Sequence, residues 1–485
     1  MKTLFVIPFL LMTLFCCNQP QHADNPPNII LMVADDLGYN DLSIYRKANP
    51  GQAEKPPTSQ TPNIDQLADE GMRFTNFYCG AAVCSPSRSA ILTGRNATRN
   101  GIYNWIPPRQ PMHLRNEEVT IAEMLKVKNY QTAHFGKWHL TAEGMGQPLM
   151  NDQGYDYSFF TYNNANPSHE NPVNFFRNGE PVGKLQGYAS HLVVDEAINW
   201  LEKNKTSENP FYINVWFNEP HEKVAAPDSL AKRHDYNQEY YGCIENMDYA
   251  VGKLIRYLKA NNMEENTIVI FSSDNGSQVY GSNYPLRGAK GFNYEGGVRV
   301  PFIIKWPGQV PAGITSEVIG SFTDVLPSIA SFCEVGLPEN RTLDGNDLSA
   351  VFTGKSSKID RRHPVFFYRY FNDPICMLRD GDWCLIGYET PIPIAERLDL
   401  REYAKFKPEP GEPQWSQWGF QESHMEKIPE IVPAHFELYN LQNDIGQQND
   451  LAGEHPDKVQ AMKAQMLQLR EEMIKDGGNW YDEKM

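Results

Sequence analysis

The chain has 485 residues, which is more than one compact core usually holds, so we expect a large domain and a smaller one. With 41% hydrophobic and 21% charged residues and no internal repeat, its composition is typical of a globular protein. The formal net charge of −16 repels polyanions, which argues against a nucleic-acid partner. An anionic substrate would need a local cluster of basic side chains, aided by a metal.

The first residues have the pattern of an export signal. Lys2 precedes an apolar run, residues 4–15, which is followed by two cysteines. The ending Leu-Phe-Cys-Cys resembles a bacterial lipobox, which implies an exported, periplasmic or cell-surface lipoprotein acylated at Cys17. Cleavage nearby without a lipid is the alternative. We predict a signal peptide over residues 1–17 and a polar tether over residues 18–27.

Residues 28–358 alternate strand-like runs with helical patterns. The plainest strands are continuous and β-branched or aromatic, as strands buried on both faces should be; they are residues 29–33, 212–217 and 267–271. Helical patterns cover residues 64–70, 120–128, 192–203 and 240–261. This alternation predicts an α/β fold with a large mixed, mainly parallel sheet between helices. We expect residues 28–358 to form the larger of the two domains.

Residues 359–485 have a different pattern and predict a smaller α+β subdomain. Strands of an antiparallel sheet are expected at residues 364–370, 376–388 and 436–441. A helix from Pro456 has one apolar stripe, which we interpret as a packing surface, formed by Val459, Met462, Met466, Leu469 and Met473. Residues 390–433, rich in Pro, Glu and Trp, predict a long insertion near the domain junction.

Six cysteines remain after the signal pair, and their spacing fits no zinc site. The even number permits disulfides without indicating any pairing. Cys243 and Cys333 lie in apolar helical patterns and are expected to be small core residues. Cys79 must not pair with Cys84 if Cys84 is reactive.

Acidic residues follow two of the predicted strands. Asp35 and Asp36 come after the first strand, and Asp274 and Asn275 come after residues 267–271. In an open α/β sheet, ligands bind at the carboxyl ends of the strands. Together these side chains would offer an all-oxygen set suited to a hard divalent ion. For either cluster alone, a helix cap is an equal alternative.

Cys84 stands where a helix is expected to begin. Pro86 suits the first turn of a helix, and Arg88 lies one turn further on. Exposed N–H groups and the helix dipole favour an anion at such an end. The pattern indicates an activated nucleophile beside an anion pocket, although a lone cysteine before a helix is usually structural.

The segment Cys-x-Pro-x-Arg, followed by Ser-Ala-Ile-Leu-Thr-Gly-Arg, resembles the signature of type I, formylglycine-dependent sulfatases. Further motifs match in the family's order between residues 28 and 330: Gly-Lys-Trp-His-Leu at 136–140, Pro-His at 220–221, Asp-Asn-Gly at 274–276, Gly-Ala-Lys-Gly at 288–291 and Glu-Gly-Gly-Val-Arg-Val-Pro at 295–301. The chain is identified as a member of this family, whose fold is alkaline-phosphatase-like. Thr141 and Cys384 depart from the common pattern, and neither is a proposed catalytic position.

The resemblance implies that a separate maturation enzyme oxidises Cys84 to formylglycine. One hydroxyl of its hydrate would attack sulfur, and the second would later expel sulfate. The implied ligands of one calcium ion are Asp35, Asp36, Asp274, Asn275 and the modified residue 84.

The resemblance also implies roles for the basic residues. Arg88, Lys137 and Lys290 would stabilise residue 84 and the sulfuryl group. His139 would remove a proton from the second hydroxyl, and His221 would protonate the leaving oxygen.

Sulfatases of this kind act on carbohydrates or aryl esters, so a sulfated glycan is the expected substrate. Residues 347–355 and 364–369 resemble the group with N-acetylgalactosamine-6-sulfatases and arylsulfatase A, which favours galactose or N-acetylgalactosamine sulfates. Specificity is expected in three loops, residues 105–113, 163–170 and 368–373. Their candidate substrate-binding residues are Arg109, His113, His169 and Arg369, and each could equally be a solvated side chain.

Two other functions remain open at this point. A phosphodiesterase or phosphomutase of the same superfamily would keep the fold, but it would usually place Ser or Thr at the nucleophile and bind two transition metals. A glycan-binding lipoprotein without turnover would have no use for the complete set of catalytic groups.

Overall fold

The computed structural model describes residues 26–47, 59–278, 281–371, 373–390 and 420–482. The predicted signal peptide, Cys17 and nearly all of the tether lie outside these residues, as does most of the expected insertion at 390–433. Within the described chain, no helix is long and apolar enough to cross a membrane.

The main sheet has ten strands in the order β11-β2-β10-β9-β1-β8-β4-β5-β6-β7. Its centre is parallel: β9 (Thr267–Ser273), β1 (Asn28–Ala34), β8 (Phe211–Trp216), β4 (Gln131–Lys137) and β5 (Tyr157–Thr161). The outer strands are β10 (Phe302–Lys305), β2 (Met72–Phe74), β11 (Ile314–Ser316), β6 (Phe176–Arg177) and β7 (Glu180–Pro181), and β10 runs antiparallel to both of its neighbours. A separate short pair joins β3 (Phe77–Tyr78) to β12 (Gly320–Ser321). The predicted mixed, mainly parallel sheet is confirmed.

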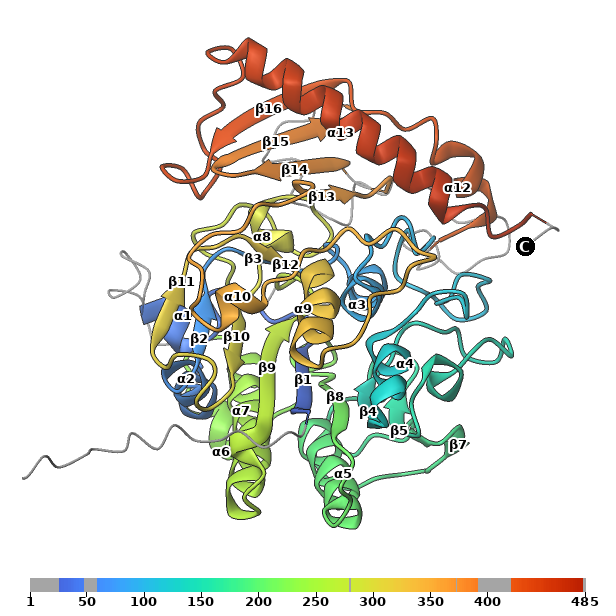
Figure 1. The fold of residues 1–485 in the computed structure, drawn as a ribbon, viewed down its shortest axis with the longest axis vertical. Coiled ribbons are helices and arrows are strands. Elements are labelled where there is room, and N and C mark those ends of the chain that lie inside the picture. The colour runs from blue at the N-terminus through green and yellow to red at the C-terminus, as the bar shows by residue number, and fades with distance from the viewer. Residues whose placement is uncertain (1–25, 48–58, 279–280, 372, 391–419, 483–485) are drawn as a thin grey trace, which may run out of the picture.

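Helices cover both faces of this sheet. Successive side chains of β1 point to opposite faces, and both sets are apolar, so each face needs helices to bury it. Ile30 and Met32 face the core built with α2 (Pro62–Asp69), α5 (Ala189–Asn204) and α7 (Gln238–Ala260). Ile29 and Leu31 face the core that includes α3 (Cys84–Thr93), α4 (Ile121–Leu125) and α9 (Val325–Phe332). Shorter helices are α1 (Ser43–Lys47), α6 (Asp228–Ala231), α8 (Glu295–Val298) and α10 (Ser349–Phe352). Figure 1 shows α5 and α7 beside the central strands.

A four-stranded antiparallel sheet forms the C-terminal part at the top of Figure 1. Its strands are β13 (Val365–Tyr368), β14 (Cys376–Asp380), β15 (Trp383–Tyr388) and β16 (His435–Asn440), and it is accompanied by α12 (Glu422–Lys427) and α13 (Pro456–Gly477). The predicted stripe of α13 packs on it, with Met466 fully buried. Residues 376–388, expected to be extended throughout, instead form a hairpin whose turn contains Gly381 at φ +55°.

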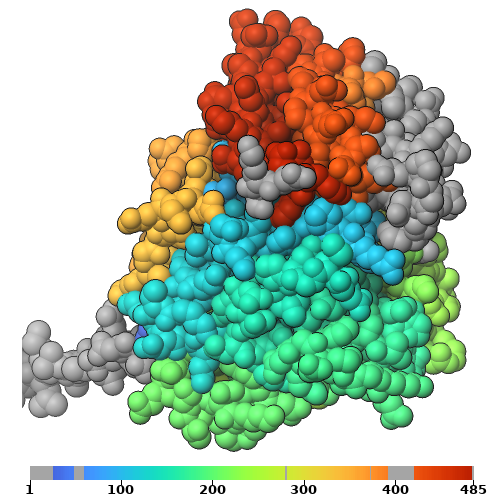
Figure 2. Space-filling model, turned by 90° about the vertical axis from the view of Figure 1, so that its right-hand side faces the viewer, coloured from blue at the N-terminus to red at the C-terminus, as the bar shows by residue number. Residues whose placement is uncertain are grey.

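The C-terminal part is tied to the larger part of the chain by polar contacts. Arg99 forms an ion pair with Asp344 at 2.9 Å and another with Asp476 of α13 at 2.7 Å. The indole N–H of Trp480 donates to the carbonyl of Gly101 at 2.6 Å. Figure 2 shows the C-terminal segment, in red and orange, resting on the blue-to-cyan part of the chain. The chain end therefore braces residues just before the predicted specificity loop 105–113.

The six described cysteines are buried and free, so Cys79 is not bonded to Cys84. Cys243 and Cys333 are core residues, as predicted, with 1% and 2% of their surface exposed. Cys384 is buried in β15.

Candidate active site

Four neighbouring parallel strands deliver the predicted site residues to one edge of the sheet. Asp35 and Asp36 follow β1, and Asp274 follows β9, which pairs with β1 so that Ala34 lies opposite Ser273. Lys137 is the last residue of β4, and His221 follows β8. Because parallel strands end at the same edge, residues far apart in the sequence meet there.

Helix α3 brings the remaining groups to this edge. It begins at Cys84, as its Pro86 predicted, and all of its residues are buried. Gly94, at φ +69°, ends it, and its N–H donates to the carbonyl of Ala90 at 3.0 Å. Cys84 thus lies at the N-terminal turn, where the helix dipole favours negative charge.

The charged side chains of the site alternate in sign. Arg88 binds Asp274 through Nε at 2.9 Å and Nη2 at 2.8 Å, and its Nη1 donates to the carbonyl of Lys137 at 2.9 Å. The Lys137 ammonium lies 2.6 Å from Asp35, and that of Lys290 lies 2.7 Å from Asp36. Three cations face three carboxylates, and such pairing is how ionised groups persist in a dry interior. Burial and the charge of Asp35 nevertheless raise the pKa of Asp274 to about 7. The basic cluster that an anionic substrate would require from this acidic chain is therefore present.

The site also has the donors of a metal site. Ligand atoms of Asp35, Asp36, Cys84 and His221 all lie within 4.8 Å of one another. The side-chain oxygen of Asn275 and one oxygen of Asp35 are buried without a hydrogen-bond partner among the described residues. Asn275 also donates to Asp36 at 2.8 Å, so its amide is fixed beside the carboxylates. Unpaired buried oxygens beside carboxylates fit a hard cation such as Ca²⁺.

Burial controls the protonation of the key groups. It raises the pKa of the Cys84 thiol to about 12, because the nearby charges of Lys137 and Lys290 only partly oppose it. Burial would also raise the pKa of Asp35, but Lys137, His221 and Arg88 hold it well below its usual value. Asp35 is therefore ionised, whereas the unmodified thiol is protonated near neutral pH and a weak nucleophile.

The two histidines are fixed by backbone carbonyls. The backbone of His139 has φ +56°, and its backbone N–H donates to the carbonyl of Tyr162 at 2.8 Å. The ring Nε2 of His139 donates to the carbonyl of Ile106 at 3.1 Å. Its Nδ1 has no hydrogen-bond partner within the described chain. The Nδ1 of His221 donates to the carbonyl of Glu222 at 2.6 Å, and its Nε2 faces Asp36 at 3.5 Å.

Burial lowers the pKa of both rings. For His139 the charges of Lys137 and Arg88 add to this effect, and for His221 the charge of Lys290 does. His139 is therefore a neutral ring with Nδ1 free to accept a proton.

The predicted substrate-binding residues occupy different surroundings. Arg109 is exposed at φ +61°. His113 is half-buried, and its ring centroid lies 4.8 Å from that of Trp480. His169 is fully buried, with Nδ1 3.5 Å from the sulfur of Cys243, so its contacts favour packing. Arg369 is buried and donates to the carbonyl of Gly291, which follows Lys290, at 2.5 Å. Arg369 is therefore hydrogen-bonded to the backbone next to Lys290, a member of the charged cluster.

Two contributors to the site were not singled out from the sequence. The side-chain oxygen of Asn164 accepts from Lys137 at 2.8 Å, and the carbonyl of Ile106 fixes the His139 ring. Asn164 lies in the predicted loop 163–170, but a run of polar residues gives no reason to choose one of them. A backbone carbonyl has no sequence signal at all.

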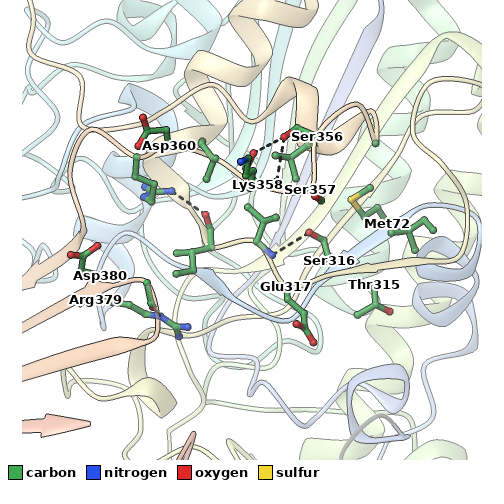
Figure 3. A pocket seen from close by; sticks show the side chains of 18 of the residues that line it. Met72, Thr315, Ser316, Glu317, Ser356, Ser357, Lys358, Asp360, Arg379 and Asp380 are labelled. Carbon is green, nitrogen blue, oxygen red and sulfur yellow. Dashed lines mark hydrogen bonds between the residues drawn. The ribbon is translucent and has the colours of Figure 1, made fainter. Parts of the chain in front are cut away.

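A cavity of about 1050 Å³ lies away from this cluster. Figure 3 shows it between Ser316 and Glu317 at the end of β11, the segment Ser356 to Asp360, and Arg379 and Asp380 of β14. None of the predicted catalytic or metal-binding residues lines it. Size alone therefore does not mark the reactive site, which needs the nucleophile and the charged groups together.

Comparison with known proteins identifies the family. Residues 27–335 match the family model described as Sulfatase. The chain belongs to the sulfatase family. This sulfatase is 31% identical over 376 residues to N-acetylgalactosamine-6-sulfatase of Canis lupus familiaris, covering 72% of the chain and 69% of that relative. It is 34% identical over 388 residues to human (Homo sapiens) arylsulfatase A, covering 72% of each.

A solved structure supports the same assignment. The crystal structure of Ps i-CgsB in complex with k-i-k-neocarrahexaose superimposes with a TM-score of 0.74 at 25% identity, covering 94% of both chains. The sequence resemblance is confirmed, and the protein is a sulfuric ester hydrolase. Members of this family use formylglycine and a metal ion, and the cluster around Cys84 is where this chain brings suitable residues together.

Proposed function

We propose that this sulfatase hydrolyses sulfate esters of carbohydrates, of galactose or N-acetylgalactosamine in particular, with formylglycine at position 84 and a bound calcium ion. The observation that carries the proposal is Cys84 at the buried start of α3, with its ligand atom within 4.8 Å of those of Asp35 and Asp36. The names of the canine relative and of the neocarrahexaose complex support a sulfated sugar as substrate.

The buried thiol gives a physical reason for the modification. With its pKa raised to about 12 by burial, it supplies almost no thiolate at neutral pH. A thiol also lacks a second group on the same carbon, the hydroxyl that is needed to release sulfate. Hydrated formylglycine supplies two hydroxyls on one carbon, one for attack and one for release.

The calcium site would use oxygen donors from Asp35, Asp36, Asp274 and Asn275, with the sulfur of Cys84 standing where an oxygen of formylglycine would be. The unpaired oxygens of Asn275 and Asp35 support this set. Bound calcium would offset negative charge on the sulfate oxygens. Asp274 is shared with Arg88, which anchors that carboxylate beside the site.

The remaining residues bind the sulfate and move protons. An ammonium group has three N–H donors; Lys137 uses two of them, on Asp35 and Asn164, and Lys290 uses one on Asp36. The donors left over would contact sulfate oxygens. The free Nδ1 of His139 would accept a proton from residue 84, and His221, when protonated, would give one to the leaving oxygen.

The proposal extends to export and maturation. A separate enzyme would oxidise Cys84, and residues 1–17 would direct export, with a lipid on Cys17 as the contact with the membrane. The catalytic domain would span residues 28–358, and the C-terminal subdomain residues 359–485.

Paired substrates test the proposal against a phosphoesterase. We expect purified protein from a converting host to hydrolyse 4-nitrophenyl sulfate and galactose or N-acetylgalactosamine monosulfates, and 4-nitrophenyl phosphate at least about a hundredfold more slowly. EDTA should remove the activity, and Ca²⁺ should restore it better than Zn²⁺. Faster phosphate hydrolysis with two bound zinc ions would establish the phosphoesterase. Sugar binding without any turnover by formylglycine-containing protein would establish the silent lipoprotein.

A further inference from the structure

The Arg88 guanidinium lies over the ring of Trp216, the last residue of β8. The guanidinium carbon is 5.1 Å from the centre of the ring. Neither side chain has any exposed surface. A cation is attracted to the negative face of an aromatic ring, and the attraction is strongest where water is excluded. Trp216 therefore adds a contact to the hydrogen bonds and ion pairs that hold Arg88.

Those hydrogen bonds leave the two faces of the guanidinium unconstrained. They go to Asp274 and to the carbonyl of Lys137, and the N–H groups of a guanidinium point outward in its own plane. Bonds in the plane fix the edge of the group but resist tilting of the plane only weakly. A ring packed against one face supplies this constraint, and Trp216 is placed to do so.

Strand pairing sets the ring and the accepting carbonyl at the same level of the sheet. Trp216 lies opposite Gly136 of β4, and Lys137 follows Gly136 directly. A Cβ atom at position 136 would collide with the carbonyl oxygen of Trp216, so the two backbones approach closely there. The ring of β8 that faces Arg88 and the carbonyl of β4 that binds it are thus fixed together.

Other rings hold Trp216 in place. The ring of Trp138 stacks on it, with centroids 6.3 Å apart and planes 20° apart. The ring of His134 meets it edge to face, with centroids 5.1 Å apart. Burial and the charge of Arg88 lower the pKa of His134 to about 3, so this ring is neutral and does not repel the guanidinium. The support for Arg88 is therefore well packed and carries no charge of its own.

The indole N–H of Trp216 leads to the same interpretation. It is buried and has no hydrogen-bond partner within the described residues. An unpaired buried N–H group is unfavourable, and phenylalanine or leucine at this position would avoid it. What Trp216 offers is therefore the face of its ring, and the cation over that face is Arg88.

We infer that Trp216 is a positioning residue for sulfate-ester hydrolysis, whose ring face keeps the Arg88 guanidinium oriented beside Asp274 and residue 84. Cys84 and Arg88 are one turn apart on α3, so their side chains share one face of the helix. Trp216 acts through Arg88 alone. The inference rests on the proposed function, because Trp216 has no chemistry of its own.

The test compares two aromatic residues of one strand face. Trp216→Leu removes the ring that faces Arg88. Tyr212→Leu removes a buried ring four residues earlier, on the same face of β8 and in the same core, and is the matched control. Both variants are assayed on 4-nitrophenyl sulfate with calcium present, and kcat is expressed per formylglycine found by mass spectrometry. Urea unfolding measures the stability that each ring contributes.

The expected effect is on turnover. Trp216→Leu should lower kcat at least about tenfold while KM stays within about threefold, because Arg88 is present but loosely held. Tyr212→Leu should also destabilise the fold, yet keep kcat within about twofold, because its ring does not face Arg88. Trp216→Phe restores a ring face and should bring kcat back to within about threefold of the unsubstituted enzyme.

A fluorinated ring keeps the test decisive if Trp216→Leu does not fold. A tetrafluorinated tryptophan, inserted at position 216 by suppression of a stop codon, nearly keeps the shape of the ring and removes most of the negative charge of its face. Its kcat should be lower than that of the unsubstituted enzyme, with a monofluorinated tryptophan between the two. Equal kcat values for the three rings would overturn the inference.

The outcomes separate this inference from the proposed function. Trp216→Leu with kcat within about twofold of the unsubstituted enzyme would overturn it. So would a loss of kcat in Tyr212→Leu as large as that in Trp216→Leu, or no recovery in Trp216→Phe. In each of these cases the unsubstituted enzyme still cleaves 4-nitrophenyl sulfate, and the proposed function stands. Failure of the calcium-loaded, formylglycine-containing enzyme to cleave any sulfate ester would instead remove the proposed function.

Discussion

The edge of the main sheet where β9, β1, β8 and β4 end, and the small sheet β13 to β16, are both buried but are filled with opposite kinds of side chain. The first holds Asp35, Asp274, Arg88 and Lys137, all without exposed surface. The second is packed with apolar residues under α13. Apolar packing stabilises a fold directly, whereas a buried ion cluster is often no more stable than the hydrophobic groups that could replace it. The charged edge is therefore explained by chemistry, and the small sheet by stability.

The largest expected effect is the loss of turnover in Cys84→Ala. If residue 84 supplies the nucleophile, kcat should fall by at least about 10⁴-fold, because the remaining groups only bind and orient substrate. Sulfate-ester hydrolysis under single-turnover conditions measures this. Stability should change little, so near-native thermal unfolding serves as the control. Retained activity would contradict the assignment of the nucleophile.

Arg88→Ala should be costly for stability as well as for activity. It leaves Asp274 without its buried partner, whereas Asp35 keeps Lys137, and breaking a buried pair costs about 3–5 kcal/mol. Urea unfolding in the presence of EDTA measures the loss without a contribution from metal binding. A loss below about 1 kcal/mol would show that water reaches this edge and that the buried-ion description is wrong.

Met466→Ala tests the apolar region alone. Met466 is fully buried between α13 and the small sheet, so truncation should lower the free energy of unfolding by about 2–5 kcal/mol. The value of kcat for 4-nitrophenyl sulfate should stay within about twofold, because Met466 packs on the small sheet, with its sulfur beside Gly387 of β15, and supplies no group to the charged edge. A large loss of kcat with an intact fold would mean that the two regions are coupled.

The smallest effect is expected on the surface. Lys253 of α7 forms an ion pair with Asp195 of α5, and both side chains are nearly half exposed. Lys253→Ala should change the free energy of unfolding by at most about 1 kcal/mol, because solvent screens the pair. This variant is the matched control for Arg88→Ala. Equal losses of unfolding free energy in Arg88→Ala and Lys253→Ala would show that the buried ion pairs stabilise the fold no more than a surface pair does.

The charged edge could be foreseen because its residues follow local signals. Asp35, Asp36 and Asp274 each come directly after an apolar strand, and Cys84 comes just before a proline that suits a helix start. Strand ends and helix starts are decided over a few residues. The mixed sheet and the α13 stripe were predictable for the same reason, because periodicity repeats along a single element.

Other features depend on contacts between distant segments. The ring of His139 is fixed by a carbonyl 33 positions away, and this contact has no side-chain signal. The sequence predicts a substrate-binding or solvated loop position for His169, yet it is buried against Cys243 of α7. The turn at Gly381, by contrast, has a local signal, the Asp380-Gly381 pair between two apolar runs, which the expectation of one extended segment overlooked.

The central claim is that residue 84 is formylglycine in the working enzyme, and mass spectrometry of the peptide spanning it is the most direct test. Protein from its native host is treated with iodoacetamide to mark free thiols and then with a hydrazide to mark aldehydes. The account predicts that the peptide before labelling is about 18 mass units lighter than the cysteine form. This peptide should react with the hydrazide and not with iodoacetamide. A fully alkylated cysteine in protein that still hydrolyses sulfate esters would contradict it.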